Sequence, residues 1–218
     1  MHRFINCKLL AMLRRTTGRL LLLLLVITGS AGTIVNNSIS KPDRKYAINL
    51  MKESHKDVVK ATKGLSEAQL DFKAAPDRWS VKECVYHIAA SEKMLWGMFE
   101  NAMKAAPNPV KRTEIKVKDE ELVMMVKDRS KKNQAPEPIQ PKNTSYKNLE
   151  DALADFKDSR TAHIRYMRTS TEDMRNRVVQ LGTNWMDCYQ LYLLIGAHSQ
   201  RHTMQLNEVK AAAGYPKE

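Results

Sequence analysis

The chain has 218 residues, with 36 Lys and Arg against 24 Asp and Glu, so its formal net charge is +12. Hydrophobic residues make up 43% and charged residues 28%, a composition typical of globular proteins that excludes a disordered chain, a collagen-like chain and a polytopic membrane protein. The length predicts one domain with an appended segment, and three cysteines are too few for a disulfide scaffold. The positive charge raises the question of a nucleic-acid or membrane-surface partner.

Residues 1–32 predict a secretory signal. They hold five basic residues and no acidic one, and an apolar run follows at 20–27 before a group of small residues. A basic start, a short apolar core and a small-residue end are the parts of a signal peptide. The apolar run is well short of the roughly 20 residues that span a bilayer. We therefore expect an exported protein, periplasmic or secreted, cleaved near Ala31 or Gly32. An uncleaved anchor is the alternative, and Met12 is a second candidate start.

After a linker at 33–42, the domain expected over 43–216 is helical. Apolar residues recur at spacings of three, four and seven, which is helical periodicity. The four long helices are expected from Pro42 to Gly64, from Ser80 onward, from about 146 to 169 and from about 187 to 213.

Residues 106–145 interrupt this pattern. They contain five of the eight prolines, so they predict a long connection with one short helix around Asp119–Arg129. The one stretch with a strand-like alternation lies near Thr113–Val117. The sequence therefore predicts an all-α fold, a four-helix bundle with a long crossover between its second and third helices. In such bundles, metal and cofactor sites are built from side chains on facing helices.

Three histidines form the candidate metal site. His198 and His202 are four residues apart in the fourth helix, so their side chains lie one turn apart and both can reach one ion. They belong to the apolar stripe of that helix and therefore point into the bundle. His87 lies on the inward stripe of the second helix. One divalent metal shared by the three imidazoles would satisfy all of them.

A structural interpretation of the histidines stays open. A histidine pair at this spacing is a weak signal by itself, and a lone His87 is more often a core or capping residue. His55 and His163 lie among charged or polar neighbours, so we expect both to be solvated. The lysine-rich run at 127–132 adjoins acidic residues and has no aromatic residue for base stacking, so we expect a solvated loop.

Neighbouring polar residues fit structural roles. The stretch from His198 to His202 resembles the H-E-x-x-H pattern of zinc proteases, but Ser199 occupies the position of the general-base Glu. Ser80 and Glu83 match a capping box, S-x-x-E. Because Glu83 is expected to serve this cap, and Glu92 has no clear role, we assign no general base.

Two more residue types near the histidines are expected to be structural. Trp79 fits a packing anchor better than a substrate platform, and Cys84 fits a small buried residue better than a metal ligand. Cys84 and Cys188 are predicted to differ in height along the bundle by about 10 Å or more, so we expect no disulfide between them.

Two stretches together resemble signatures of the DinB-like metal-binding four-helix-bundle superfamily. The stretch similar to the helix-two signature reads Trp79-Ser80-x-x-Glu83-x-x-x-His87. The stretch similar to the helix-four signature reads His198-Ser-Gln-Arg-His202-x-x-Gln205-Leu206, and Gly214 ends that helix. The resemblance covers about residues 43–216. It implies a four-helix bundle with a three-histidine site for a divalent metal, often zinc or nickel, and it implies His87, His198 and His202 as the ligands.

The resemblance also implies candidate activities. Some members of the superfamily are similar to thiol S-transferases, which use bacillithiol, or to a mycothiol-dependent isomerase, and many members have no known activity. The secretory signal and the length of the connection at 106–145 depart from the family's pattern. The resemblance further implies that a homodimer is an option for the assembly.

Two classes of function follow. The first is a metal-dependent enzyme acting on a small molecule, either a hydrolase that activates water or a transferase that holds a thiolate. The second is a non-catalytic envelope protein, a binding or stress-related bundle whose metal is structural or absent. Nucleic-acid binding rests on charge alone, and five basic residues belong to the expected signal, so the remaining chain carries 31 minus 24, or +7. We therefore expect no nucleic-acid partner.

Overall fold

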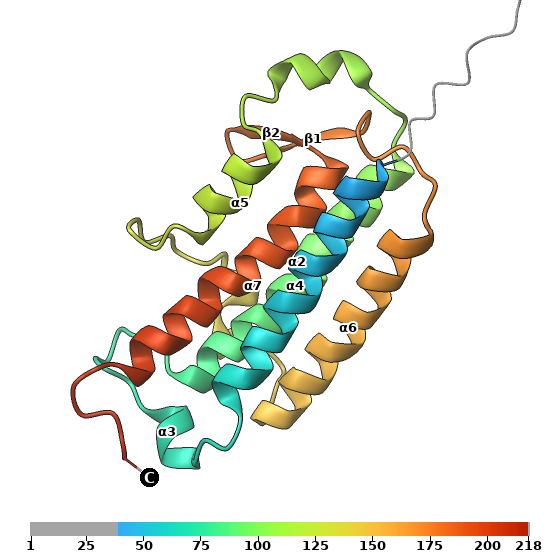
Figure 1. Cartoon of the computed structure of the whole chain (residues 1–218). Coiled ribbons are helices and arrows are strands. Elements are labelled where there is room, and N and C mark those ends of the chain that lie inside the picture. The colour runs from blue at the N-terminus through green and yellow to red at the C-terminus, as the bar shows by residue number, and fades with distance from the viewer. Residues whose placement is uncertain (1–38, 218) are drawn as a thin grey trace, which may run out of the picture. The chain divides into compact units, whose positions relative to one another are not determined.

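The computed structural model of the chain describes residues 39–217 (Figure 1). The expected secretory segment at 1–32 lies outside the described residues, as does most of the expected linker at 33–42. Within the described part of the chain, none of the helices combines the length and the apolar character that a membrane crossing requires.

Four long helices form the predicted bundle; they are α2 (Lys41–Thr62), α4 (Val81–Lys104), α6 (Leu149–Thr169) and α7 (Cys188–Lys210). Helix α7 packs against α2 and α4, and α6 packs against the same two helices. The all-α, four-helix-bundle prediction is therefore confirmed. Helix α2 begins two residues before the expected start of the domain at residue 43, because Ser40 caps it and accepts a hydrogen bond from the Asp43 amide.

The second helix of the bundle starts as its sequence predicts. The Ser80 hydroxyl accepts from the Glu83 amide at 3.2 Å, and the Glu83 carboxylate accepts from the Ser80 amide at 2.9 Å. This reciprocal pair is a capping box, which satisfies two amides that the first turn of a helix leaves free. The cap fixes where α4 begins, and therefore which residues of α4 face the bundle interior.

Helix α7 lies at the centre of the fold. All residues from Cys188 to Ala197 are buried, so this half of the helix is covered on every side. A Cβ on Gly196 would lie 2.8 Å from Leu50 Cγ and 3.3 Å from Met51 Sδ. Glycine at this position therefore lets α2 approach α7 closely.

The long connection between α4 and α6 is folded onto the bundle. It contains α5 (Asp119–Lys127), which packs against α7, and three short 3₁₀ helices, which are η1 (Pro109–Glu114), η2 (Glu137–Ile139) and η3 (Pro141–Asn143). The short helix expected around Asp119–Arg129 is therefore confirmed. The strand expected near Thr113–Val117 is wrong, because the 3₁₀ helix that begins at Pro109 includes Thr113 and Glu114, and residues 115–117 form no strand.

Outside the long connection, two elements of the described chain were not predicted from the sequence. One is the five-residue helix α3 (Glu67–Asp71), which Ser66 caps. The other is an antiparallel hairpin, β1 (Val178–Leu181) and β2 (Asn184–Asp187), just before α7. Its two-residue turn places Gly182 at φ +61°, whereas Thr183 keeps a negative φ, the pattern of a type II′ turn.

The cysteines behave as the sequence predicts. Cys84 and Cys188 are both buried and free, and the described residues contain no disulfide. Burial raises the pKa of the Cys188 thiol to about 12, so this thiol stays protonated at neutral pH.

Candidate metal centre

The structure brings the three predicted histidines together. His87 comes from α4, and His198 and His202 come from α7. One nitrogen from each ring lies within 4.8 Å of the nitrogens of the other two. Nε2 of His198 and Nε2 of His202 are 3.2 Å apart. Helical spacing thus places the pair, and the packing of α4 against α7 adds the third ring.

Hydrogen bonds at the far side of two rings fix their orientation. His87 Nδ1 lies 2.8 Å from the Ile139 carbonyl oxygen, and His202 Nδ1 lies 2.9 Å from Gln205 Oε1. Both oxygens accept, so each Nδ1 carries the proton and each Nε2 keeps its lone pair. Arg129 donates to the same Gln205 oxygen at 3.1 Å, which holds the amide in this orientation. Such outer contacts are typical of metal-ligating histidines.

The donor set fits a divalent metal ion. In a tetrahedral site with bonds of 2.0–2.1 Å, the ligand nitrogens are about 3.3 Å apart, close to the separation of Nε2 in His198 and His202. Desolvation lowers the pKa of His198 to about 3, and it also lowers the pKa of His87 and His202. The three imidazoles are therefore neutral at neutral pH, the form that binds a metal.

The groups around the histidines carry little negative charge. The described residues place no Asp, Glu or Cys in the histidine group. Ser91 Oγ lies 3.3 Å from His87 Nε2. The Trp79 ring is 4.8 Å from the His87 ring and 5.9 Å from the His202 ring, measured between centroids. Trp79 is thus a packing residue, as predicted, and it also lines the cavity that opens over the site.

The three histidines line a cavity of about 760 Å³, a volume typical of small-molecule sites. Its walls come from α4, α7, α5 and the hairpin. The histidine group therefore has protein on one side and open space on the other. Three protein ligands with an open side are typical of catalytic metal sites, whereas structural zinc sites are closed by four protein ligands.

Helix α5, which forms one wall of the cavity, is fixed at its C-terminal end by an arginine of α7. The Arg201 guanidinium donates to the carbonyl oxygens of Val126, Asp128 and Lys131, and its side chain is buried. Arg129 also pairs with Glu208 of α7 at 2.6 Å. The expected solvated loop at 127–132 is therefore wrong for Arg129, which the Glu208 carboxylate and the Gln205 amide hold against the bundle.

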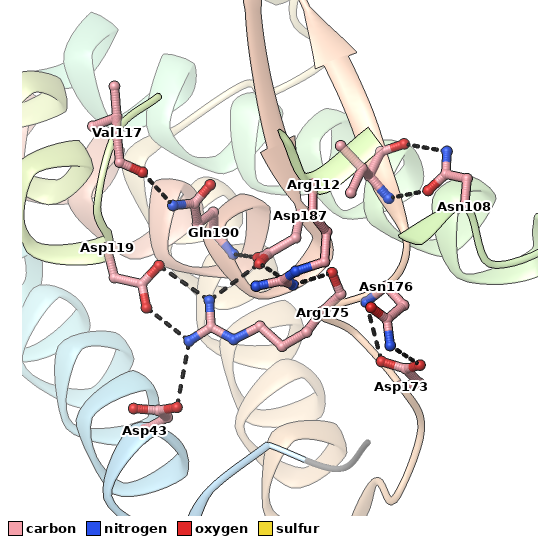
Figure 2. Close-up of polar contacts among 11 residues, drawn as sticks. Asp43, Asn108, Arg112, Val117, Asp119, Asp173, Arg175, Asn176, Asp187 and Gln190 are labelled. Carbon is pink, nitrogen blue, oxygen red and sulfur yellow. Dashed lines mark hydrogen bonds and ion pairs between the residues drawn. The ribbon is translucent and has the colours of Figure 1, made fainter. Parts of the chain in front are cut away.

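The N-terminal end of α5 is fixed by a second arginine (Figure 2). Arg175 pairs with Asp119 at 2.7 Å, with Asp187 at 3.1 Å and with Asp43 at 3.3 Å. Gln190 of α7 donates to the Val117 carbonyl at 2.8 Å in the same cluster. These contacts join α5, the start of α7 and the start of α2, so the cavity wall is tied to the bundle at both ends.

A second buried histidine lies in a different cluster. His163 Nδ1 donates to Glu92 Oε1 at 2.7 Å, and Glu92 Oε2 accepts from Arg160 at 2.7 Å. Arg160 also donates to Ser54 at 2.9 Å and to Ser199 at 2.8 Å. Arg160 and Glu92 are almost completely buried. This Arg160 cluster, made of these five residues, joins α2, α4, α6 and α7.

The Arg160 cluster corrects the expectation that His163 is solvated, and it also occupies Glu92. His163 is not solvated, because it lies on the inner face of α6 and stacks on Trp96 with 3.8 Å between ring centroids. Glu92 is not free to act as a general base, because its two oxygens are engaged by His163 and Arg160. His55 is half-buried against Phe156 rather than solvated. The sequence held one signal for this burial. Arg160 is seven residues after Leu153 and His163 is four residues before Met167, so helical spacing places both on the inner face of α6.

Comparison with known proteins agrees with this fold. The DinB superfamily matches residues 50–206. YuaE of Bacillus subtilis strain 168 is 24% identical over 165 residues, covering 75% of this chain and 96% of YuaE. The structure is similar to that of YfiT from Bacillus subtilis, with a TM-score of 0.57 and 18% identity over 82% of this chain and 92% of YfiT. YfiT is described as a probable metal-dependent hydrolase with an unusual four-helix bundle topology.

Proposed function

This chain belongs to the DinB superfamily, and from this premise we propose that it is a metal-dependent hydrolase of a small molecule. The observation that carries the proposal is the group of three neutral imidazoles, His87, His198 and His202, on the wall of an open cavity. A site that used these residues only for stability would be closed by a fourth protein ligand. The described activity of YfiT supports the same reaction class.

Each residue of the centre has a defined task in this proposal. His87, His198 and His202 would hold the ion, and the Ile139 carbonyl and Gln205 keep two of the rings in the ligating tautomer. A divalent metal supplies a Lewis acid that polarises a carbonyl oxygen and makes water nucleophilic near neutral pH. Imidazole ligands suit zinc and nickel, the two metals we propose.

The surroundings favour hydrolysis over a reaction that needs a carboxylate base. Glu92 is the nearest buried carboxylate along α4, and it is fully used by Arg160 and His163. Arg201 is buried beside the two histidines of α7 and contacts carbonyl oxygens rather than a carboxylate. Its positive charge would favour a substrate whose reaction develops negative charge on oxygen.

The proposal includes the setting of the protein. We propose that residues 1–32 export the chain to the periplasm or the exterior, on the basis of five basic residues and an apolar run. Small molecules, rather than nucleic acid, are the proposed partners, and a homodimer is the proposed assembly. The mass of the mature protein tests whether residues 1–32 are removed. Its retention on size exclusion tests the proposed homodimer.

The central test compares metal content with turnover. Elemental analysis of purified protein is expected to give close to one zinc or nickel per chain, and His202→Ala is expected to lose it. His55→Ala, which changes a histidine outside the group, is the matched control and is expected to keep the metal. A panel of esters and amides is expected to be hydrolysed by the metal-loaded protein.

Three other outcomes would contradict this function. Full stability without metal, and no effect of His202→Ala, would favour the non-catalytic envelope protein. Turnover that appears only when a thiol and an electrophile are supplied would favour the S-transferase. Metal in the protein without turnover of any kind would make the metal structural.

A further inference from the structure

The cavity over the histidines is elongated along the bundle axis. His87 faces His202 with 4.4 Å between ring centroids, whereas Phe99, further along α4, faces Tyr192 at 6.3 Å. Helices α4 and α7 are therefore antiparallel. The cavity lining follows α4 from His87 to Leu95 and α7 from His198 back to Gln190, a separation of eight residues on each helix. At 1.5 Å per residue, the cavity extends about 12 Å from the histidines toward the hairpin.

The part of the cavity beyond the histidines has apolar walls. They come from four elements, and the residues that define them are Met94, Leu95, Leu122, Met125, Trp185 and Leu194. Leu95, Leu122 and Leu194 are almost fully buried, and Met125 is 58% exposed. Methionine and tryptophan side chains adapt to long apolar ligands because they offer a large, polarizable contact area.

Apart from Gln190, the polar residues of the cavity that are not exposed lie toward its metal end, whereas Glu114, Thr183 and Asn184, which also line it, are exposed. The histidines, Ser91 and Arg201 lie there, whereas Gln190 at the opposite end already donates its amide to Val117. Lys116 and Lys132 line the cavity as well, and both are exposed. A ligand that matches this lining is polar at one end and apolar over the remaining length.

We propose that the substrate is an ester or amide with a linear acyl chain, whose carbonyl lies at the histidines and whose chain extends toward the hairpin. This inference rests on the proposed hydrolase function and names its substrate class. In the reaction, water adds to the acyl carbon and the bond to the leaving oxygen or nitrogen breaks. The leaving group takes a proton, and the acyl chain is released as a carboxylic acid.

Calorimetric titration of metal-free protein with decanoate and butyrate tests the apolar part of the cavity. Decanoate has six more methylene groups, so it is expected to bind at least about tenfold more tightly, even if only part of the chain is buried. Equal affinities for the two acids would overturn the inference, because they would mean that the apolar walls contribute nothing to binding.

Two neighbouring methionines of α5 provide matched variants. Met125 lines the cavity, whereas Met124 does not, and their exposed fractions are 58% and 63%. Because both side chains are exposed, neither Met125→Asp nor Met124→Asp is expected to prevent folding. Met125→Asp places a charge in the apolar wall and is expected to weaken decanoate binding about tenfold, while Met124→Asp changes it less than about twofold. Equal losses in the two variants would overturn the inference.

The orientation of the chain is tested with zinc. If the carboxylate of decanoate lies at the histidines, zinc-loaded protein binds decanoate several-fold more tightly than metal-free protein, and His202→Ala removes this gain. No gain on adding zinc would overturn the orientation. If the protein binds decanoate but hydrolyses no ester, the proposed function fails and the apolar site stands. If it hydrolyses acetyl and decanoyl esters equally and binds no decanoate, the function stands and the acyl-chain inference fails.

Discussion

Two polar clusters lie side by side in this bundle, and they are built on opposite principles. The Arg160 cluster pairs a buried guanidinium with a buried carboxylate, and the guanidinium also donates to Ser54 of α2 and Ser199 of α7. The histidine centre contains three uncharged rings with one nitrogen of each close to those of the other two, beside an open cavity. Both Glu92 oxygens of the first cluster are engaged within the core, whereas the second cluster faces an open cavity.

Residues of the two clusters are close together along α7 and α4, but the rotation of the helix points their side chains in different directions. On α7, Ser199 follows His198 directly, but consecutive residues point about 100° apart. Ser199 therefore binds Arg160 in the core, and His198 lines the cavity. On α4, Glu92 and His87 are divided in the same way. A buried polar residue thus reveals its role by where its remaining donor or acceptor atoms point.

The largest expected effect comes from breaking the closed cluster. Arg160→Ala leaves Glu92 as a buried carboxylate without its cation, so the free energy of unfolding is expected to fall by about 3–5 kcal/mol. Urea denaturation measures this change. Lys157→Ala, one turn earlier on α6 and exposed, is the control and is expected to change stability by less than about 0.5 kcal/mol. A loss below about 1 kcal/mol for Arg160→Ala would mean that the cluster is not closed as described.

Removing metal from the open cluster should have the next largest effect on stability. If metal binds the folded chain as proposed, saturation at 100 times its Kd contributes about 2.7 kcal/mol. A chelator is therefore expected to lower the Tm of the wild-type protein, and zinc is expected to restore it. His202→Ala is expected to resemble the chelated protein, with no response to either reagent. A chelator effect of equal size in His202→Ala would place the metal elsewhere.

The outer contacts of the histidines should have a smaller effect. Gln205 holds the Nδ1 of His202 and is held in turn by Arg129. Gln205→Ala is expected to weaken zinc affinity by about 10–100-fold with little change in the stability of metal-free protein. Asn207→Ala, two residues later and exposed, serves as the control. Competition with a chromophoric chelator measures both affinities, and equal affinities would show that Gln205 does not position the ring.

These two clusters also show what the sequence could and could not predict. His198 and His202 were predictable, because a spacing of four on an apolar stripe fixes both their proximity and their direction. The Ser80–Glu83 cap and the four helices followed from equally local rules. The burial of His163 was not predicted, because it depends on Glu92 and Arg160, and Glu92 lies 71 residues away along the chain.

The hairpin and the cavity wall escaped prediction for a related reason. The strands of the hairpin have four residues each, too few for an alternating pattern to stand out. Gly182 at the first turn position was the one local signal. The wall formed by α5 depends on Arg175 and Arg201, whose partners lie in distant segments. Sequence periodicity therefore predicts the bundle, whereas the position of α5 over the site depends on ion pairs and hydrogen bonds between distant segments.

The smallest expected effect concerns the Arg175 contacts that hold α5 over the histidines. These contacts are partly exposed, unlike the Arg160 cluster, and they do not line the cavity. Asp119→Asn removes one partner of Arg175, which retains Asp187 and Asp43, so the stability loss is expected to be about 0.5–1 kcal/mol and smaller at high salt. Hydrogen exchange is expected to increase in the first turns of α5, while zinc affinity stays within about twofold, because no histidine contacts this cluster. Glu120→Gln, an exposed neighbour, should leave exchange unchanged. Weaker zinc binding in Asp119→Asn would show instead that the Arg175 contacts and the metal centre act as one unit.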